Sequence, residues 1–112
     1  ERDGYDVTIH VPITFSQAVL GDDVEVPTVD GRIVQHIPEG TQSGTKFRLR
    51  GQGIQYLNGR GRGDQYVIVD VEIPKKVTRA QREALKAFED SMKEDNYEKR
   101  KGFFKNLRDR FS

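Results

Sequence analysis

The sequence contains no cysteine and no tryptophan, and it has only two histidines, His10 and His36. Without cysteine there is no disulfide and no thiolate chemistry, and a structural zinc site is not expected because such sites take their ligands mainly from cysteine and histidine. No apolar run approaches the roughly 20 residues of a membrane-spanning helix, and no segment resembles a signal peptide. The first residue is Glu1 rather than Met, which favours a piece of a longer protein.

The composition leaves room for only a small core. Of the 112 residues, 34% are apolar and 33% are charged, yet six Phe and four Tyr argue against a fully disordered chain. Residues 1–74 carry a net charge of −4, and residues 75–112 carry +5. A basic stretch of this size is more often a solvated or partner-facing surface than a nucleic-acid site. This difference in net charge predicts that residues 1–74 and 75–112 are different kinds of segment.

The segment from Asp64 to Pro74 has the strongest strand signal in the chain. Val67, Val69, Val71 and Ile73 alternate with more polar positions, so they are predicted to share one face that needs a core. Pro74 has no N–H to donate to a neighbouring strand and is predicted to end the segment. We expect the β-domain to end here.

Shorter strands and one helix are predicted before this segment. A helix over residues 15–20 is expected because Thr14 and Gln17 form a capping box and Gly21 ends the turn. Asp30-Gly31 predicts a type I′ hairpin turn, which needs positive φ at both central residues. The glycine-rich residues 51–63 are expected to be an extended, mobile connection. The strands are predicted over residues 7–13, 24–27, 32–37 and 46–50.

Beyond Pro74 the periodicity changes to that of helices. Thr78 and Gln81 form a second capping box, which predicts a helix over residues 79–93, and residues 94–101 are expected to be a charged linker. A second helix is predicted over residues 102–111. It is too short to be stable alone in water, so its apolar face needs a docking surface. We therefore predict a homodimer whose contact residues are Leu85, Phe88, Met92, Phe103, Phe104, Leu107 and Phe111.

No motif in the sequence carries a catalytic reaction. Gly51-Gln52-Gly53 lacks the third glycine of a dinucleotide-binding loop, and no helix is expected after it. Neighbouring carboxylates such as Asp22-Asp23 point apart on a strand, and no nucleophile lies in register with His10. The arginine-glycine repeat of residues 59–63 is more typical of a glycine-rich hairpin loop than of an RNA-binding segment. We predict that the chain is not an enzyme, with a small RNA- or anionic-surface-binding β-domain as the alternative function.

Several linked motifs resemble one family. Their order and spacing are similar to those of the second C-terminal β-domain of bacterial DnaJ, the J-domain co-chaperone family. The resemblance covers residues 3 to about 90 well and the tail more loosely. The motifs are residues 11–21 (VPITFSQAVLG), 24–31 (VEVPTVDG), 40–44 (GTQSG), 47–53 (FRLRGQG) and 63–67 (GDQYV).

The resemblance implies an all-β fold, a small two-layer β-sandwich with one short helix between strands, over residues 1–76. Residues 77–112 would then be a helical dimerisation segment. The implied function is to bind non-native polypeptide clients and to join two protomers, within a cytoplasmic protein that assists a DnaK-type chaperone in protein folding and the stress response. By analogy with the family's peptide groove, Val7, Val24 and Val26 are candidate peptide-binding residues, with ordinary core as the alternative.

The same resemblance implies which parts of the family this stretch lacks. It has no J-domain with a His-Pro-Asp signature, no cysteine-rich zinc repeats and no first C-terminal β-domain. Zinc is therefore expected only in the cysteine-rich region of a parent protein, and no cofactor is expected in this fragment. Stimulation of ATP hydrolysis by the DnaK-type partner would likewise need the parent protein.

Overall fold

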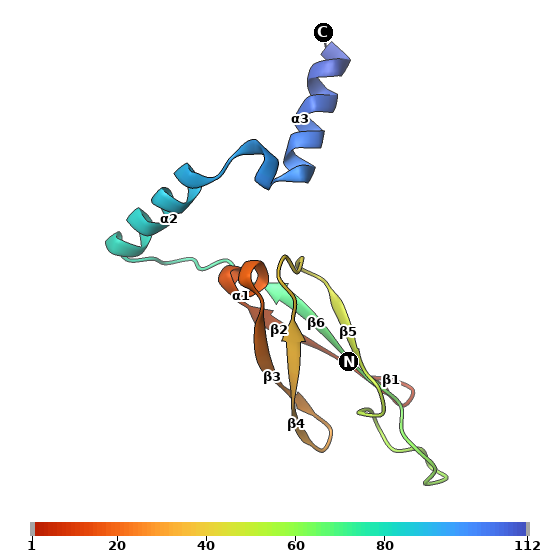
Figure 1. The fold of residues 1–112 in the computed structure, drawn as a ribbon. Coiled ribbons are helices and arrows are strands. Elements are labelled where there is room, and N and C mark those ends of the chain that lie inside the picture. The colour runs from red at the N-terminus through yellow and green to blue at the C-terminus, as the bar shows by residue number, and fades with distance from the viewer. Residues whose placement is uncertain (1, 112) are drawn as a thin grey trace. The chain divides into compact units, whose positions relative to one another are not determined.

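The chain folds into two compact units that divide between Ile73 and Pro74 (Figure 1). The structure is a computed structural model and describes residues 2–111. The first unit holds all the described strands and one short helix, and the second unit holds only helices. The predicted fold class, a small β-sandwich followed by C-terminal helices, is confirmed.

Two small sheets make up the first unit. The larger sheet has the order β1-β2-β6-β5, and the smaller one is the antiparallel pair β3-β4. The segment with the strongest strand signal forms β6, an interior strand that runs parallel to β2 and antiparallel to β5. The strands are β1 (Arg2–Asp3), β2 (Asp6–Ile13), β3 (Asp22–Thr28), β4 (Gly31–Ile37), β5 (Lys46–Leu49) and β6 (Gln65–Val71).

The core lies between the two sheets. The larger sheet contributes alternate residues of its strands, as the strand period of two requires, and helix α1 (Phe15–Leu20) adds Ala18. Gln65 is also buried, and its side-chain amide donates to the Pro27 carbonyl at 2.6 Å, which joins the sheets. The buried apolar residues are Ile13, Ala18, Val26, Ile37, Leu49, Val67 and Val69.

Helix α1 has the predicted boundaries. The Thr14 side chain accepts a hydrogen bond from the Gln17 N–H at 3.0 Å, and the Gln17 side chain accepts one from the Thr14 N–H. Gly21 ends the helix with φ of 80°, and a Cβ there would lie 2.8 Å from the Ile37 carbonyl oxygen. The capping box and the glycine stop are confirmed.

The turn between β3 and β4 differs from the prediction. The hairpin is present, but Thr28 pairs with Gly31, so Val29 and Asp30 form the turn. Among residues 2–111 no residue other than glycine has positive φ, which rules out a type I′ turn at Asp30-Gly31. Gly31 takes the positive φ, at 149°, as the first residue of β4.

The end of β6 also differs from the prediction. Ile73 is 73% exposed and does not join the core with Val67 and Val69. Its neighbour Glu72 still donates its N–H to the carbonyl of Ile13, but β2 ends there. Beyond that point no partner strand holds the chain extended, so alternation alone placed Ile73 wrongly.

The glycine-rich segment is not an extended connection. It folds back on itself as a hairpin, with Gly53 and Gly63 joined by a backbone hydrogen bond of 3.0 Å. Both glycines are buried against Tyr5, whose carbonyl accepts from the Ile54 N–H at 2.9 Å, and the Tyr5 ring meets Tyr56 edge to face. The glycines are therefore needed for a close backbone approach.

We predict that amides in this hairpin exchange faster than amides in β6. Amides of residues 54–62 should exchange faster on average than those of β6, because Leu57 at the tip is 92% exposed while β6 is paired on both sides. Hydrogen exchange followed by mass spectrometry measures both segments in one experiment. Equal protection of the two segments would contradict this expectation.

Asp64 joins the base of the hairpin to β5. Its carboxylate accepts from the Gly51 N–H at 2.9 Å and pairs with the Arg48 guanidinium at 2.6 Å. The Gly51 hydrogen bond and then Arg48 lower the pKa of Asp64 below its ordinary value of 3.8. The first unit should therefore gain stability from this carboxylate above that pH.

We predict a pH-dependent effect of Asp64→Asn on unfolding of the first unit. The variant should unfold at lower denaturant than the native chain at pH 7, and the difference should shrink as the pH falls below 3.8, through the lowered pKa of Asp64 in the folded state. Denaturant titrations at pH 7, 4 and 2.5 measure this difference, with Asp90→Asn in the second unit as the control. A difference at pH 2.5 as large as the one at pH 7 would contradict the assignment.

The second unit consists of three helical elements. These are α2 (Arg79–Ser91), η1 (Glu94–Asn96) and α3 (Glu98–Phe111). The Thr78–Gln81 capping box is confirmed. The predicted linker over 94–101 is wrong, because good helix formers extend α3 back to Glu98 and the Lys101 N–H bonds to the Tyr97 carbonyl. In residues 2–111 no helix is both long and apolar enough to cross a membrane.

Candidate functional site

Helix α2 presents its apolar residues on the surface of the second unit. Leu85 and Phe88 lie three positions apart and so share one helical face, and Met92 is the residue directly after the helix. Leu85 is 59% exposed and Phe88 is 36% exposed, and no residue of α2 is buried. A globular domain normally covers such a face, so this one is suited to an intermolecular contact.

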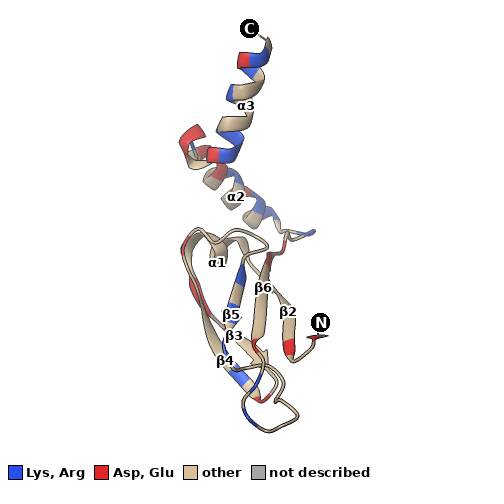
Figure 2. Cartoon of the chain, turned by 90° about the vertical axis from the view of Figure 1, so that its right-hand side faces the viewer, with Lys and Arg blue, Asp and Glu red and all other residues tan. Residues whose placement is uncertain are grey.

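Helix α3 has the same character. Phe104, Leu107 and Phe111 follow the predicted face, Phe103 flanks it, and the four are between 36% and 78% exposed. The rings of Phe103 and Phe104 meet edge to face at 5.0 Å, and the Arg100 guanidinium lies 4.7 Å from the Phe104 ring centre. Cations are frequent along the rest of the helix (Figure 2). The aromatic side chains are ordered against each other and remain accessible.

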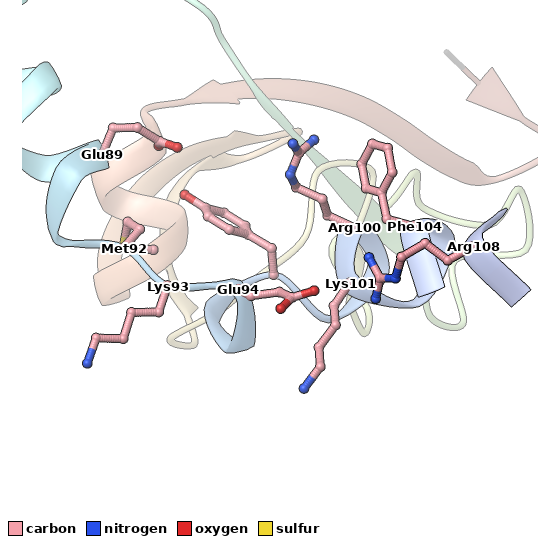
Figure 3. A pocket seen from close by; sticks show the side chains of 9 residues that line it. Glu89, Met92, Lys93, Glu94, Arg100, Lys101, Phe104 and Arg108 are labelled. Carbon is pink, nitrogen blue, oxygen red and sulfur yellow. The ribbon is translucent and has the colours of Figure 1, made fainter. Parts of the chain in front are cut away.

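A pocket of about 330 Å³ joins these two helices (Figure 3). Met92 at the end of α2, Tyr97 after η1 and Phe104 on α3 supply its apolar part, while Arg100 and Arg108 contribute cations. Lys101, also in the lining, pairs with Asp95, and this contact lowers the pKa of Asp95 and raises that of Lys101. The ion pair connects η1 to α3.

The structure brings together only part of the predicted dimerisation set. Met92 and Phe104 line the same pocket, whereas the other predicted residues lie on exposed helical faces outside it. Sequence reasoning missed Tyr97 and Arg100, because both lie in residues 94–101, for which the composition predicts a charged linker. The one signal was an aromatic residue inside a charged run, four positions before Lys101.

The three candidate peptide-binding residues lie on two different sheets. Val7 is on β2, while Val24 and Val26 are on β3 (Figure 1). Val26 is 1% exposed and belongs to the core, so a peptide cannot reach it without a rearrangement of the sandwich. Val7 and Val24 are both half-buried, and Val24 packs against the core from β3.

The sandwich also presents strand edges. Strand β1 pairs only with Asp6 and Val7 of β2, so the remainder of β2 lies at an edge, and β5 forms the opposite edge. Pro12 and Pro27 interrupt the donor groups of β2 and β3, which limits uncontrolled pairing with other strands. Edges of this kind can accept an additional extended chain.

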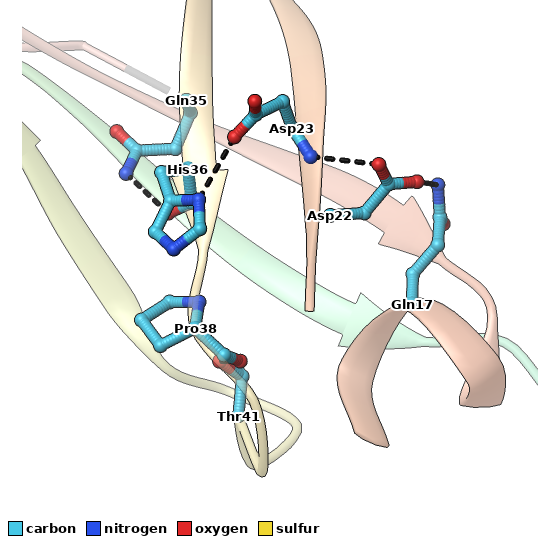
Figure 4. A network of polar contacts seen from close by, with 7 residues as sticks. All are labelled: Gln17, Asp22, Asp23, Gln35, His36, Pro38 and Thr41. Atoms are coloured by element: carbon cyan, nitrogen blue, oxygen red, sulfur yellow. Dashed lines mark hydrogen bonds and ion pairs between the residues drawn. The ribbon is translucent and has the colours of Figure 1, made fainter. Parts of the chain in front are cut away.

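Polar contacts near α1 form a network rather than a catalytic centre (Figure 4). The His36 ring nitrogen Nδ1 and Asp23 lie 2.8 Å apart across the β3–β4 pair, and Gln17 donates to Asp22. In the described residues no three or more His, Cys, Asp or Glu side chains gather as metal ligands. The network fastens α1 to β3 and β4.

The arginine-glycine repeat is partly neutralised. Arg62 forms an ion pair with Asp30 at the β3–β4 turn, and the backbone N–H of Arg60 donates to the Asn58 side chain at 2.9 Å. These contacts fit a structured hairpin loop. A cationic surface for RNA would need arginines that are available to phosphates.

Comparisons with known proteins agree with one another. Residues 1–74 match the family model of the DnaJ C terminal domain, and residues 80–112 match that of the chaperone protein DnaJ C-terminal region. The chain is 52% identical over 110 residues to the chaperone protein DnaJ of Ruminiclostridium cellulolyticum, an alignment that covers 98% of this chain and 29% of that relative. It is 50% identical over 109 residues to the protein of the same name from Acetivibrio thermocellus, covering 97% and 28%. The chain thus spans less than a third of the length of these relatives.

Proposed function

This chain belongs to the DnaJ family, as its C-terminal domain and region, and from that premise we propose that it is a module of a co-chaperone that binds non-native polypeptide and joins two protomers. It carries out no reaction of its own. The observation that supports this most is that no described residue of α2 or α3 is buried, although both carry large apolar side chains. Surfaces of this kind suit contacts with other polypeptides.

Client binding is assigned to the sandwich. Unfolded chains offer apolar side chains and unpaired backbone, and the strand edges together with Val7 and Val24 can contact both. Because the chain spans only a part of its relatives, cooperation with a DnaK-type chaperone in the cytoplasm, and any bound zinc, belong to the parent protein in this proposal.

Subunit joining is assigned to the second unit. Phe103, Phe104, Leu107 and Phe111 of α3 are the proposed anchors. The receiving surface is formed by Leu85 and Phe88 of α2 with Met92 directly after it. Two protomers related by a two-fold axis would bury both sets at once. The basic side chains on the other faces keep the assembly in solution.

Fluorescence anisotropy with a labelled, permanently unfolded polypeptide tests the client role. Apolar capture should change little between low and high salt, because it depends on surface removed from water. A single-stranded RNA of similar length is the competing probe, and its electrostatic binding should weaken steeply with salt. Binding to the RNA but not to the polypeptide would overturn the proposal in favour of an RNA-binding domain.

A further inference from the structure

Strand β5 is an edge with a one-sided pattern of charge. It contains four residues, pairs with β6 on one side, and ends the larger sheet. In an antiparallel pair only every second residue of a strand directs its backbone groups to a given neighbour, so an edge strand directs the alternate groups outward. Backbone donors and acceptors for one more strand are therefore arranged along this edge.

The two faces of this edge differ in chemistry. Phe47 is half-buried and Leu49 is buried, and both face the core. Lys46 and Arg48 are exposed on the opposite face, and Arg50 continues the alternation directly after the strand. A chain that adds to β5 would therefore meet apolar side chains on one face and cations on the other.

Neighbouring groups hold two of these cations in place. The Lys46 ammonium lies 4.3 Å from the centre of the Tyr66 ring on β6. Arg48 pairs with Asp64, which is itself fixed by the Gly51 N–H. Arg48 is thus paired with a carboxylate, and Lys46 and Arg50 add further positive charge along the edge. Ordered charges lose less conformational freedom on binding than free ones.

We propose that the β5 edge binds an extended client segment as an additional strand, and that it selects segments in which acidic and apolar residues alternate. This inference rests on the proposed function, since the occupant is a client polypeptide. Side chains that face each other on paired strands interact directly, and opposite charges there are favourable. Glutamate or aspartate of the added strand would face Lys46 and Arg48, and its apolar residues would extend the surface of Phe47.

The same cations restrict which strands can add. Lysine on an edge strand discourages pairing with neutral or basic strands, including a second copy of β5 itself. Attraction of acidic segments and repulsion of basic ones together give specificity. The edge is thereby protected from aggregation and open to one class of partner.

Two synthetic peptides test the proposal. One alternates glutamate and valine over ten residues, and its counterpart carries lysine in place of glutamate. Anisotropy titration with this chain at low salt should give a dissociation constant about tenfold lower for the acidic peptide, as expected for two or three opposite-charge pairs across strands. Equal affinity for the two peptides would overturn the proposal.

Charge-reversal variants locate the site. The double variant Lys46→Glu with Arg50→Glu should lose about tenfold affinity for the acidic peptide, whereas Lys75→Glu with Lys76→Glu, outside the sandwich strands, should bind unchanged. Amide exchange should slow within β5 when the acidic peptide is bound. Protection confined to β2, β3 or the second unit would overturn the assignment. If an unfolded polypeptide still binds under that outcome, the proposed function stands and only the β5 edge fails.

Discussion

A chain shortened to end at Lys101 is expected to sediment as a monomer at micromolar concentration, where the full chain is expected to sediment as a dimer. The deletion removes Phe103, Phe104, Leu107 and Phe111, the exposed anchors of α3. Burying one Phe or Leu side chain contributes roughly 1.5–3 kcal/mol. Four such residues can offset much of the cost of association, which is several kcal/mol or more. Sedimentation velocity over a concentration series measures the change directly.

A matched pair of point variants tests whether the apolar face of α3, rather than the helix as a whole, forms the interface. Leu107→Glu places a charge in the proposed interface, whereas Asn106→Glu places the same charge one residue away, on a different face of α3. The first should raise the dimer dissociation constant by about 100-fold or more, as expected for an unpaired charge in an interface, and the second should change it little. A shortened chain that stays dimeric, with its sandwich folded, would show that α3 is not the anchor.

Gly63→Ala is expected to destabilise the first unit severely. A Cβ on Gly63 would lie 2.1 Å from the carbonyl oxygen of Tyr5 and 2.4 Å from its carbonyl carbon, and backbone atoms cannot rotate away as a side chain can. Forcing an extra carbon into a closely packed site costs typically 1–3 kcal/mol and occasionally more, so we expect about 3 kcal/mol. Denaturant unfolding followed by tyrosine fluorescence measures the loss.

Gly102→Ala is the matched control for this substitution. A Cβ on Gly102 meets no atom within 4 Å, and its φ is not positive, so alanine should stabilise α3 by roughly 0.5–1 kcal/mol. Gly59→Ala tests the other cause of strain, because its φ is +71° while the space around it is open. If Gly63→Ala unfolds at the same denaturant concentration as the native chain, the close approach of Gly63 to the Tyr5 backbone does not exist in solution.

Local patterns predicted the elements of the fold well. Alternation identified β6, and the two capping boxes placed the starts of α1 and α2, because each depends on residues within a few positions of one another. The incorrect predictions concern residues whose surroundings depend on contacts with residues far away in the sequence. Ile73 continues the alternation of β6 but lies beyond its partner strand, and Gly63 looks flexible until Tyr5 is placed against it.

The candidate sites were less predictable than the fold. The exposed faces of α2 and α3 followed from helical spacing, since Leu85, Phe104 and Phe111 lie where the period of 3.6 puts them. The pocket did not follow, because it depends on where the chain turns between Met92 and Glu98. Whether Val26 lines a peptide groove or lies in the core also depends on how the two sheets pack, and no local sequence pattern encodes that packing.

The most direct test of a dimeric client-binding module compares two clients on two forms of the chain. The full chain and the form ending at Lys101 are titrated with a short apolar peptide and with a long unfolded polypeptide. Both forms should bind the short peptide equally, because the sandwich is unchanged. The long client should bind the dimer at least roughly tenfold more tightly, because it can engage two protomers at once. Equal affinity of both forms for the long client would contradict the account.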